Sequence, residues 1–221
     1  GNAVESLSLN AAATTAASGA GLTVSYTAGT GMLSITGSAT KAVYQSILQG
    51  ILYNDTSNTP TTSNRSITVV TNDGAINSAT QTVTLTVAAV NDAPTATITP
   101  LTYAATEQTT LTLHGTGLAV ADVDAGGATN MVATLSVGEG TLTVVPGTSG
   151  VTVGGSGTGS VTLTGSVAQI NTLLASAGGA TGTITYIDNT DTPSASTVLT
   201  LLVNDAGNTG GGALTGSDTA T

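Results

Sequence analysis

Oxygen-bearing side chains gather at a few places in this chain, and their types and spacing could bind a metal ion. Asn91 and Asp92 lie in a short polar stretch that ends in Pro94. Their amide and carboxylate oxygens are hard ligands of the kind that Ca²⁺ prefers. Proline fixes its own backbone and keeps the residue before it extended, so the stretch predicts a short, stiff connector. We expect two β-modules to meet here end to end, with metal ions stiffening the joint.

A second pair of carboxylates, Asp122 and Asp124, lies two positions apart. An extended or turning backbone brings both to one side, where they repel each other unless a cation lies between them. The alternative is that both cap a turn, because Asp commonly accepts hydrogen bonds from backbone amides two or three residues ahead. We favour the metal interpretation. Asp73, Asp55, Asp188 and Asp191 are predicted to be solvated turn residues instead.

The composition excludes several classes of function. The formal net charge is −10, with Lys41 and Arg65 as the two basic residues. Nucleic-acid binding is excluded because phosphates need Lys and Arg to neutralise them. The absence of cysteine rules out disulfides, zinc–thiolate sites and thiol catalysis. No apolar run reaches the roughly 18 residues of a membrane span, and no signal peptide is visible, which favours a fragment or a mature piece.

Enzymatic chemistry finds no support in the sequence. The single histidine, His114, lies in an alternating strand pattern and is predicted to be a surface residue. No Ser-His-Asp arrangement follows from its spacing. The glycine-rich stretch 154–159 has no following Lys and predicts a hairpin turn rather than a phosphate-binding loop. We predict that the protein is not an enzyme.

Hydrophobic periodicity predicts a chain of strands interrupted by short helices. Alternation over residues 22–26, 32–36, 66–71 and 80–90 is typical of β-strands. Residues 38–48 change to helical spacing after a Ser/Thr cap, which predicts a short crossover helix. The small, polar stretch 11–21 is predicted to be a loop.

The same plan recurs in the second half. Thr36-Gly37-Ser38 matches Thr164-Gly165-Ser166, and Tyr53 and Pro60 recur as Tyr186 and Pro193 at an equal separation. We predict an all-β fold of two tandem β-sandwich modules, 1–92 and 93–221, each with a short crossover helix. Residues 218–221 look like the beginning of a last strand, so the second module is expected to lack the rest of it or to receive it from a neighbour.

Four motifs together carry a resemblance to a known family: Asn91-Asp92-Ala93-Pro94, Glu107, Asp122-Val123-Asp124-Ala125-Gly126 and Asn204-Asp205-Ala206-Gly207. In this order they resemble the cadherin-like, Ig-like tandem repeats of giant bacterial surface adhesins of the RTX type. The resemblance covers most of the chain. It implies β-sandwich modules with Ca²⁺ bound between successive modules.

The resemblance also implies a ligand set: Asn91, Asp92, Asp122, Asp124, Asp205, Glu5 and Glu107. Asn91 and Asp92 would be linker ligands, and the other three aspartates would come from loops at that end of the second module. Glu5 and Glu107 resemble the early-strand glutamate that closes the site below its own module. Glu5 would serve the internal joint, and Glu107 a joint beyond Thr221. Module one has no Asp-x-Asp, so no metal site is expected at its outer end.

The resemblance implies a structural extender of an extracellular adhesin on a bacterial cell surface, contributing to cell adhesion or biofilm. Its partners would be adjacent repeats or neighbouring subunits, and the target, a surface glycan or a protein, would be bound elsewhere in the parent protein. One alternative is a subunit of an extracellular filament or surface layer that assembles by strand donation. Another alternative is a carbohydrate-binding module. It is weaker because sugar stacking needs aromatic rings on one face, and the five tyrosines are scattered along the chain.

Overall fold

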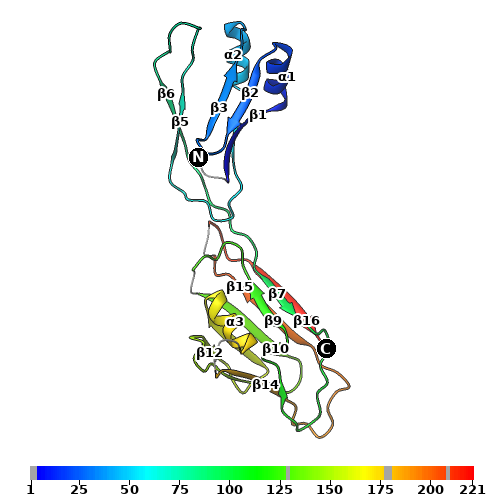
Figure 1. Cartoon of the computed structure of the whole chain (residues 1–221). Helices are drawn as coiled ribbons and strands as arrows, with labels where there is room; N and C mark the ends of the chain where they lie inside the picture. Colours follow the sequence, from blue (N-terminus) through cyan, green and yellow to red (C-terminus); the bar gives the residue numbers. More distant parts are fainter. Residues whose placement is uncertain (1–3, 128–129, 177–180, 208–209) are drawn as a thin grey trace. The chain divides into compact units, whose positions relative to one another are not determined.

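The computed structural model describes residues 4–127, 130–176, 181–207 and 210–221. It is mostly β-structure in several sheets, with three helices in the described part of the chain. The chain divides into two compact units, Gly1–Pro60 and Thr61–Thr221, and Figure 1 shows the elements of each. This division falls earlier in the chain than the boundary between residues 92 and 93 that the sequence predicts.

Unit one contains two antiparallel strand pairs and two helices. Its elements are β1 (Glu5–Leu9), α1 (Ala11–Gly19), β2 (Thr23–Thr27), β3 (Met32–Thr36), α2 (Lys41–Leu48) and β4 (Ile51–Asp55). β1 pairs with β4, and β2 pairs with β3. The buried core of this unit is small and comprises Ala13, Ala17, Leu22 and Ile47.

Helix α1 replaces the loop that the sequence predicts for residues 11–21, so that prediction is wrong. Asn10 caps the helix, because its Oδ1 accepts a hydrogen bond from the Ala13 amide at 2.8 Å. Alanine has the highest intrinsic helix propensity, and Ala13 and Ala17 form the buried face. The helix lacks large apolar residues, so it gives little periodic signal. The predicted crossover helix is confirmed as α2.

Unit two is built around a five-stranded and a three-stranded sheet (Figure 1). The larger sheet has the order β12 (Thr152–Gly154), β13 (Ser160–Gly165), β10 (Met131–Val137), β15 (Leu199–Asn204) and β16 (Thr215–Ala220). The smaller sheet has the order β11 (Thr141–Val145), β14 (Thr183–Ile187) and β8 (Leu111–Thr112). Two further pairs are β7 (Thr95–Ile98) with β9 (Leu118–Ala121) and β5 (Arg65–Val69) with β6 (Gln81–Leu85).

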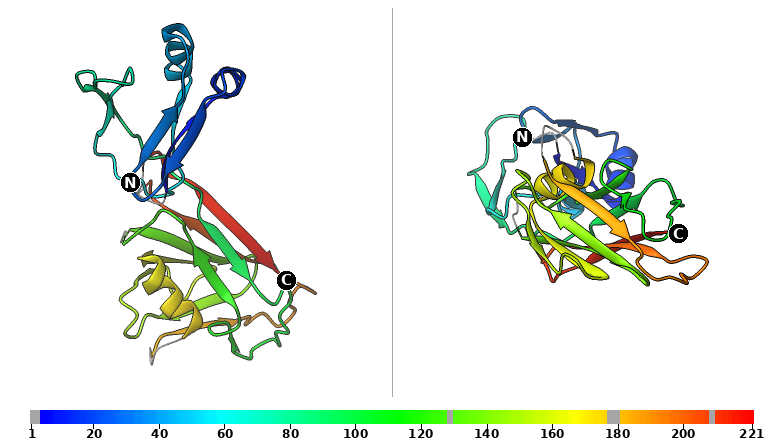
Figure 2. Two further views of the ribbon diagram at one scale, coloured as in Figure 1. Left: turned by 45° about the horizontal axis from the view of Figure 1, so that its top comes forward. Right: turned by 90° about the horizontal axis from the view of Figure 1, so that it is seen from below.

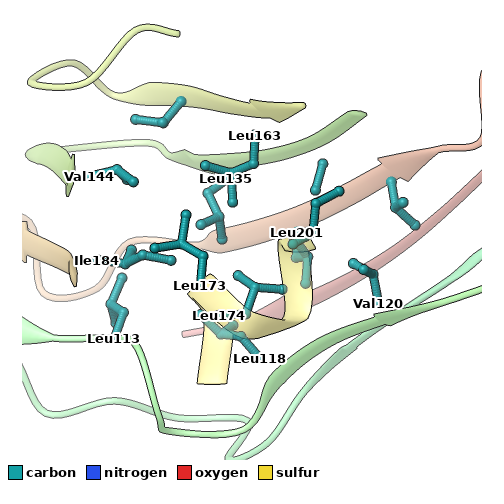
Figure 3. Packing of buried hydrophobic residues seen from close by; sticks show 14 of the residues in the cluster. Leu113, Leu118, Val120, Leu135, Val144, Leu163, Leu173, Leu174, Ile184 and Leu201 are labelled. Atoms are coloured by element: carbon teal, nitrogen blue, oxygen red, sulfur yellow. The ribbon is translucent and has the colours of Figure 1, made fainter. Parts of the chain in front are cut away.

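Alternating apolar residues of β10 form the centre of the unit-two core. Met131, Ala133 and Leu135 are fully buried, as alternation in a half-buried strand requires. Figure 3 shows Leu173 and Leu174 of helix α3 (Val167–Ala175) reaching into the same cluster. Ser166 and Gln169 cap this helix reciprocally, which starts it directly after β13.

Apart from helix α1, the order of elements in unit one and β5–β6 recurs in the second half of unit two. The pairs β1–β4, β2–β3 and β5–β6 correspond to β11–β14, β12–β13 and β15–β16, and α2 corresponds to α3. The last strand is not truncated as predicted. β16 is formed over Thr215–Ala220 and pairs with β15 along its whole length, and Figure 2 shows both strands side by side. The elements β7 to β10 have no counterpart among the described residues before β5.

Candidate metal centre

The polar stretch at Asn91 and Asp92 lies against two loops of unit two. The Asn91 Nδ2 donates hydrogen bonds to Asp205 Oδ2 at 2.6 Å and to the Gly212 carbonyl at 3.0 Å. The Asp92 amide donates to Asp124 Oδ2 at 2.9 Å. Residues from three separate parts of the chain therefore converge. Because Asp122 is bonded to the Asp124 amide, five of the seven predicted ligands lie in one hydrogen-bonded cluster.

Asp122 and Asp124 occupy the loop that follows β9. Asp122 Oδ1 accepts hydrogen bonds from the amides of Asp124 at 3.1 Å and Ala125 at 3.2 Å. The turn-capping interpretation therefore holds for this oxygen. Asp124 is only 2% exposed, so the loop turns its second carboxylate inwards, toward the backbone at Asp92.

Asp205 lies in the tight turn after β15 and is completely buried. Its Oδ1 accepts hydrogen bonds from the amides of Gly207 and Leu214, both at 2.8 Å. Burial alone would raise the pKa of Asp205, but the amides of Gly207 and Leu214 and the side chain of Asn91 together lower it. The structure therefore holds Asp205 as a buried anion that accepts hydrogen bonds from the neutral amides of Asn91, Gly207 and Leu214.

Two oxygen atoms of this cluster are buried and lack a hydrogen-bond partner: Asn91 Oδ1 and Asp122 Oδ2. A buried acceptor without a partner costs roughly 1–3 kcal/mol, and more when the group is charged. Burial raises the pKa of Asp122, and the neighbouring Asp124 carboxylate raises it further. Both atoms are hard oxygens, so their chemistry fits a Ca²⁺ ion as the missing partner.

Asp122 and Asp124 are the neighbouring carboxylates of the cluster, and Asp205 bonds to the Asn91 amide instead. Among the residues that the structure describes, no group of three or more His, Cys, Asp and Glu side chains is placed to hold a metal ion. A Ca²⁺ site here would depend on mixed ligands, with the Asn91 amide oxygen and backbone carbonyls beside the Asp122–Asp124 pair. Ca²⁺ sites commonly use such sets of six to eight oxygens.

The two glutamates of the predicted set lie elsewhere. Glu5 begins β1 in unit one, where its backbone carbonyl accepts a hydrogen bond from the Tyr26 hydroxyl at 2.8 Å. Glu107 lines a cavity of about 410 Å³ in unit two, together with Glu139, Tyr186 and Asp188. Glu107 thus lies in a different part of unit two from the cluster around Asn91, and the roles that the resemblance implies for both glutamates stay predictions.

The sequence did not single out Glu139, and it assigned Asp188 to solvent. Asp188 is only 7% exposed, and its Oδ1 accepts from the Thr190 amide at 3.0 Å and the Thr190 hydroxyl at 2.8 Å. Glu139 Oε2 accepts from the Ser194 amide at 3.0 Å. Glu139 bonds to a loop residue 55 positions later in the chain, and no local sequence pattern reveals such a contact.

His114 is half-buried rather than exposed, which corrects the prediction for it. Its Nδ1 accepts a hydrogen bond from the Ile184 amide at 3.0 Å, so the ring completes the pairing of the chain beyond β8 with β14. The five tyrosines are half-buried or buried, and three of their hydroxyls bond within the protein. None of the five presents an exposed ring on which a sugar could stack.

None of the helices in the described part of the chain has the length and apolar character needed to cross a bilayer. Comparisons of the chain with protein-family models, with curated proteins and with solved structures gave no match.

Proposed function

We propose that this chain is part of a structural extender in an extracellular bacterial adhesin. In this proposal it contributes two tandem Ig-like or cadherin-like β-sandwich modules to a rod that holds a binding tip away from the cell. Ca²⁺ bound near Asn91 and Asp122 stiffens the joint between modules. The adhesin would serve cell adhesion or biofilm formation.

One observation supports the calcium part of the proposal above all others. Asn91 Oδ1 and Asp122 Oδ2 are buried oxygens without a donor, in a cluster that also contains the buried Asp124 and Asp205. A protein that only needed to cap a turn would gain nothing from burying these atoms, because each costs free energy unless a partner satisfies it. A divalent cation satisfies both oxygens and removes the repulsion between Asp122 and Asp124.

Calorimetric titration with CaCl₂ tests the proposal. The chain should bind Ca²⁺ with a dissociation constant of about 10⁻⁴–10⁻³ M, the range of extracellular calcium modules. Asp122→Ala should weaken binding at least about tenfold, which corresponds to roughly 1.4 kcal/mol. Asp73→Ala is the matched control, because Asp73 is an exposed turn residue of the same unit. Equal binding heats for Asp122→Ala and wild type would contradict the proposal.

Assembly into a filament by donation of a last strand has lost its original support. That alternative depended on an incomplete β16, and the strand is formed and fully paired. The carbohydrate-binding alternative is likewise not favoured, since four of the five tyrosines are half-buried and Tyr186 is buried.

A further inference from the structure

Strand β9 pairs with one strand, β7, among the described strands, and a side chain bonds its other edge. Asn171 of helix α3 contacts both backbone groups of Val120. Its Oδ1 accepts from the Val120 amide at 2.9 Å, and its Nδ2 donates to the Val120 carbonyl at 2.7 Å. One amide side chain thus supplies the pair of hydrogen bonds that a neighbouring antiparallel strand would supply.

Asparagine is a poor residue for the middle of a helix, so its presence in α3 calls for a physical reason. Its side chain competes with the helix backbone for hydrogen bonds, yet Asn171 is half-buried on a helix whose apolar face is fully buried. Val120 is only 3% exposed, so its amide and carbonyl would meet little water without this partner, and buried backbone groups need one. The contact with β9 explains why asparagine occupies this position.

The bonded strand leads directly into the candidate metal centre. β9 ends at Ala121, which pairs with Thr95, the first residue of β7. The aspartate loop, Asp122–Ala125, follows at once, and the Asp92 amide ahead of β7 donates to Asp124 Oδ2 at 2.9 Å. The cluster of oxygens therefore lies at the end of the β7–β9 pair, and a displacement of β9 against α3 would displace the aspartate loop.

Apolar packing alone does not fix β9 along its own axis. Leu118 and Val120 point from β9 into the core cluster that also contains Leu174 of α3 (Figure 3), but the hydrophobic effect is non-directional. Hydrogen bonds have a preferred distance and angle. The two bonds from Asn171 therefore set the position of the strand, and with it the position of the aspartate loop.

We propose that Asn171 is a positioning residue of the candidate calcium site, through its two hydrogen bonds to Val120. The calcium part of this inference rests on the proposed function. Asn171 holds β9 so that Asp122 and Asp124 lie beside Asn91 before an ion arrives. A preformed site loses less conformational freedom on binding, which raises affinity. Because coupling between two sites is reciprocal, bound Ca²⁺ strengthens the contact at Val120 in turn.

Replacement of Asn171 by alanine tests the proposal. Asn171→Ala removes both hydrogen bonds without weakening the helix, because alanine has the highest helix propensity. Calorimetric titration should show a Ca²⁺ dissociation constant at least about tenfold higher than that of wild type. Thr172→Ala is the matched control, since the Thr172 hydroxyl bonds the Ala168 carbonyl of the same helix at 2.8 Å rather than β9. It should bind Ca²⁺ as wild type does.

A second control separates positioning from a general loss of stability. Val144→Ala removes buried apolar atoms from β11 of the same core and should lower the free energy of unfolding, yet the folded protein should keep the Ca²⁺ affinity of wild type. Hydrogen exchange in chelator should show the same contrast. Asn171→Ala should speed exchange of the Asp124 and Ala125 amides about tenfold more than that of Met131–Val137, because the loop opens locally.

Wild type provides a measurement that needs no variant, since saturating CaCl₂ should slow exchange of the Val120 amide. Equal Ca²⁺ affinities of Asn171→Ala and Thr172→Ala would overturn the proposal. So would loop amides of Asn171→Ala whose exchange speeds up no more than that of β10. If wild type bound no calcium, the proposed function would fall by itself, and loop exchange in chelator would still decide whether Asn171 holds the aspartate loop.

Discussion

At the scale of single residues, the most informative side chains are acids whose oxygens are buried, because burial of a carboxylate costs free energy unless a partner satisfies it. Asp205 and Asp122 are both acids near the Asn91–Asp92 stretch, yet their environments differ. Hydrogen bonds from Gly207, Leu214 and Asn91 outweigh burial and lower the pKa of Asp205, whereas burial and Asp124 raise the pKa of Asp122. Asp205 is thus stabilised as an anion by the protein alone, and Asp122 requires a proton or a cation.

Replacement of Asp122 by Asn should therefore change the free energy of unfolding in opposite directions with and without calcium. The raised pKa of Asp122 means that its contribution to stability is fully present below the ordinary value of 3.8 and is lost as pH rises through the folded-state pKa. Asn has no proton to lose and keeps the Oδ1 acceptor. In chelator at pH 7, Asp122→Asn should equal or exceed wild type in free energy of unfolding. In Ca²⁺ at about a hundred times the dissociation constant, wild type should gain roughly 2.7 kcal/mol that the variant lacks.

Denaturant unfolding at pH 4 and pH 7, in chelator and in calcium, measures both effects. Asp73→Asn makes the same change of charge at an exposed turn and should respond to calcium as wild type does. A variant that is less stable than wild type to the same extent in all four conditions would show that Asp122 acts only as a turn cap.

At the scale of elements, close backbone contact holds the stretch before β7 against β16. A Cβ atom on Gly216 would overlap the Pro94 carbonyl oxygen, so only glycine allows this approach. The Ile98 amide also donates to Asp218 Oδ2 at 2.8 Å, which ties β7 to the same strand. The position of Asn91 and Asp92 thus depends on a strand more than 100 residues later in the chain.

Gly216→Ala should push β16 and the Pro94 backbone apart. Overpacking of this kind typically costs about 1–3 kcal/mol, and it should also weaken calcium binding because it displaces Asn91. Gly29→Ala is the control, since a Cβ there meets no atom within 4 Å and Gly29 does not belong to the cluster around Asn91 described above. Denaturant unfolding and calcium titration of both variants check the prediction. Equal stability of the two variants would show that the close contact has no energetic importance.

At the scale of the whole molecule, the composition supplies little positive charge of its own. With 12 acidic and 2 basic residues, the chain has few ion pairs available to hold its parts together. A cation that binds carboxylates from separate segments can replace such pairs. On the proposed function, its removal should change the mobility of the joint rather than the folding of the modules.

Asp124→Ala should accordingly loosen the joint without unfolding either module. Small-angle scattering of wild type and variant, each with calcium and with chelator, should give a distinct maximum dimension only for wild type with calcium. Circular dichroism should show unchanged β-structure in all four samples, and Asp73→Ala should behave as wild type. An identical maximum dimension in all four samples would refute the proposed brace.

Several features followed from local sequence. Alternation located β2, β3, β5 and β6, and the Ser/Thr caps located α2 and α3, because these signals depend on neighbours within one turn or one pleat. The convergence of Asp122, Asp124 and Asp205 near Asn91 also follows from the motifs, through their resemblance to adhesin repeats. By contrast, α1 was missed because an alanine-rich helix carries no apolar stripe.

What the sequence by itself determined is the β-rich character of the chain, its recurring plan of elements and the set of oxygens near the Asn91–Asp92 stretch. Only the tertiary structure decided that β16 forms over Thr215–Ala220 and pairs with β15, that Asp188 and His114 are buried or half-buried, and that β3 pairs only with β2 among the described strands. The physical reason is that strand pairing and burial depend on residues far apart in the chain. Pairing of β10 with both β13 and β15 fills the core of unit two, and this pairing joins residues up to about 70 positions apart.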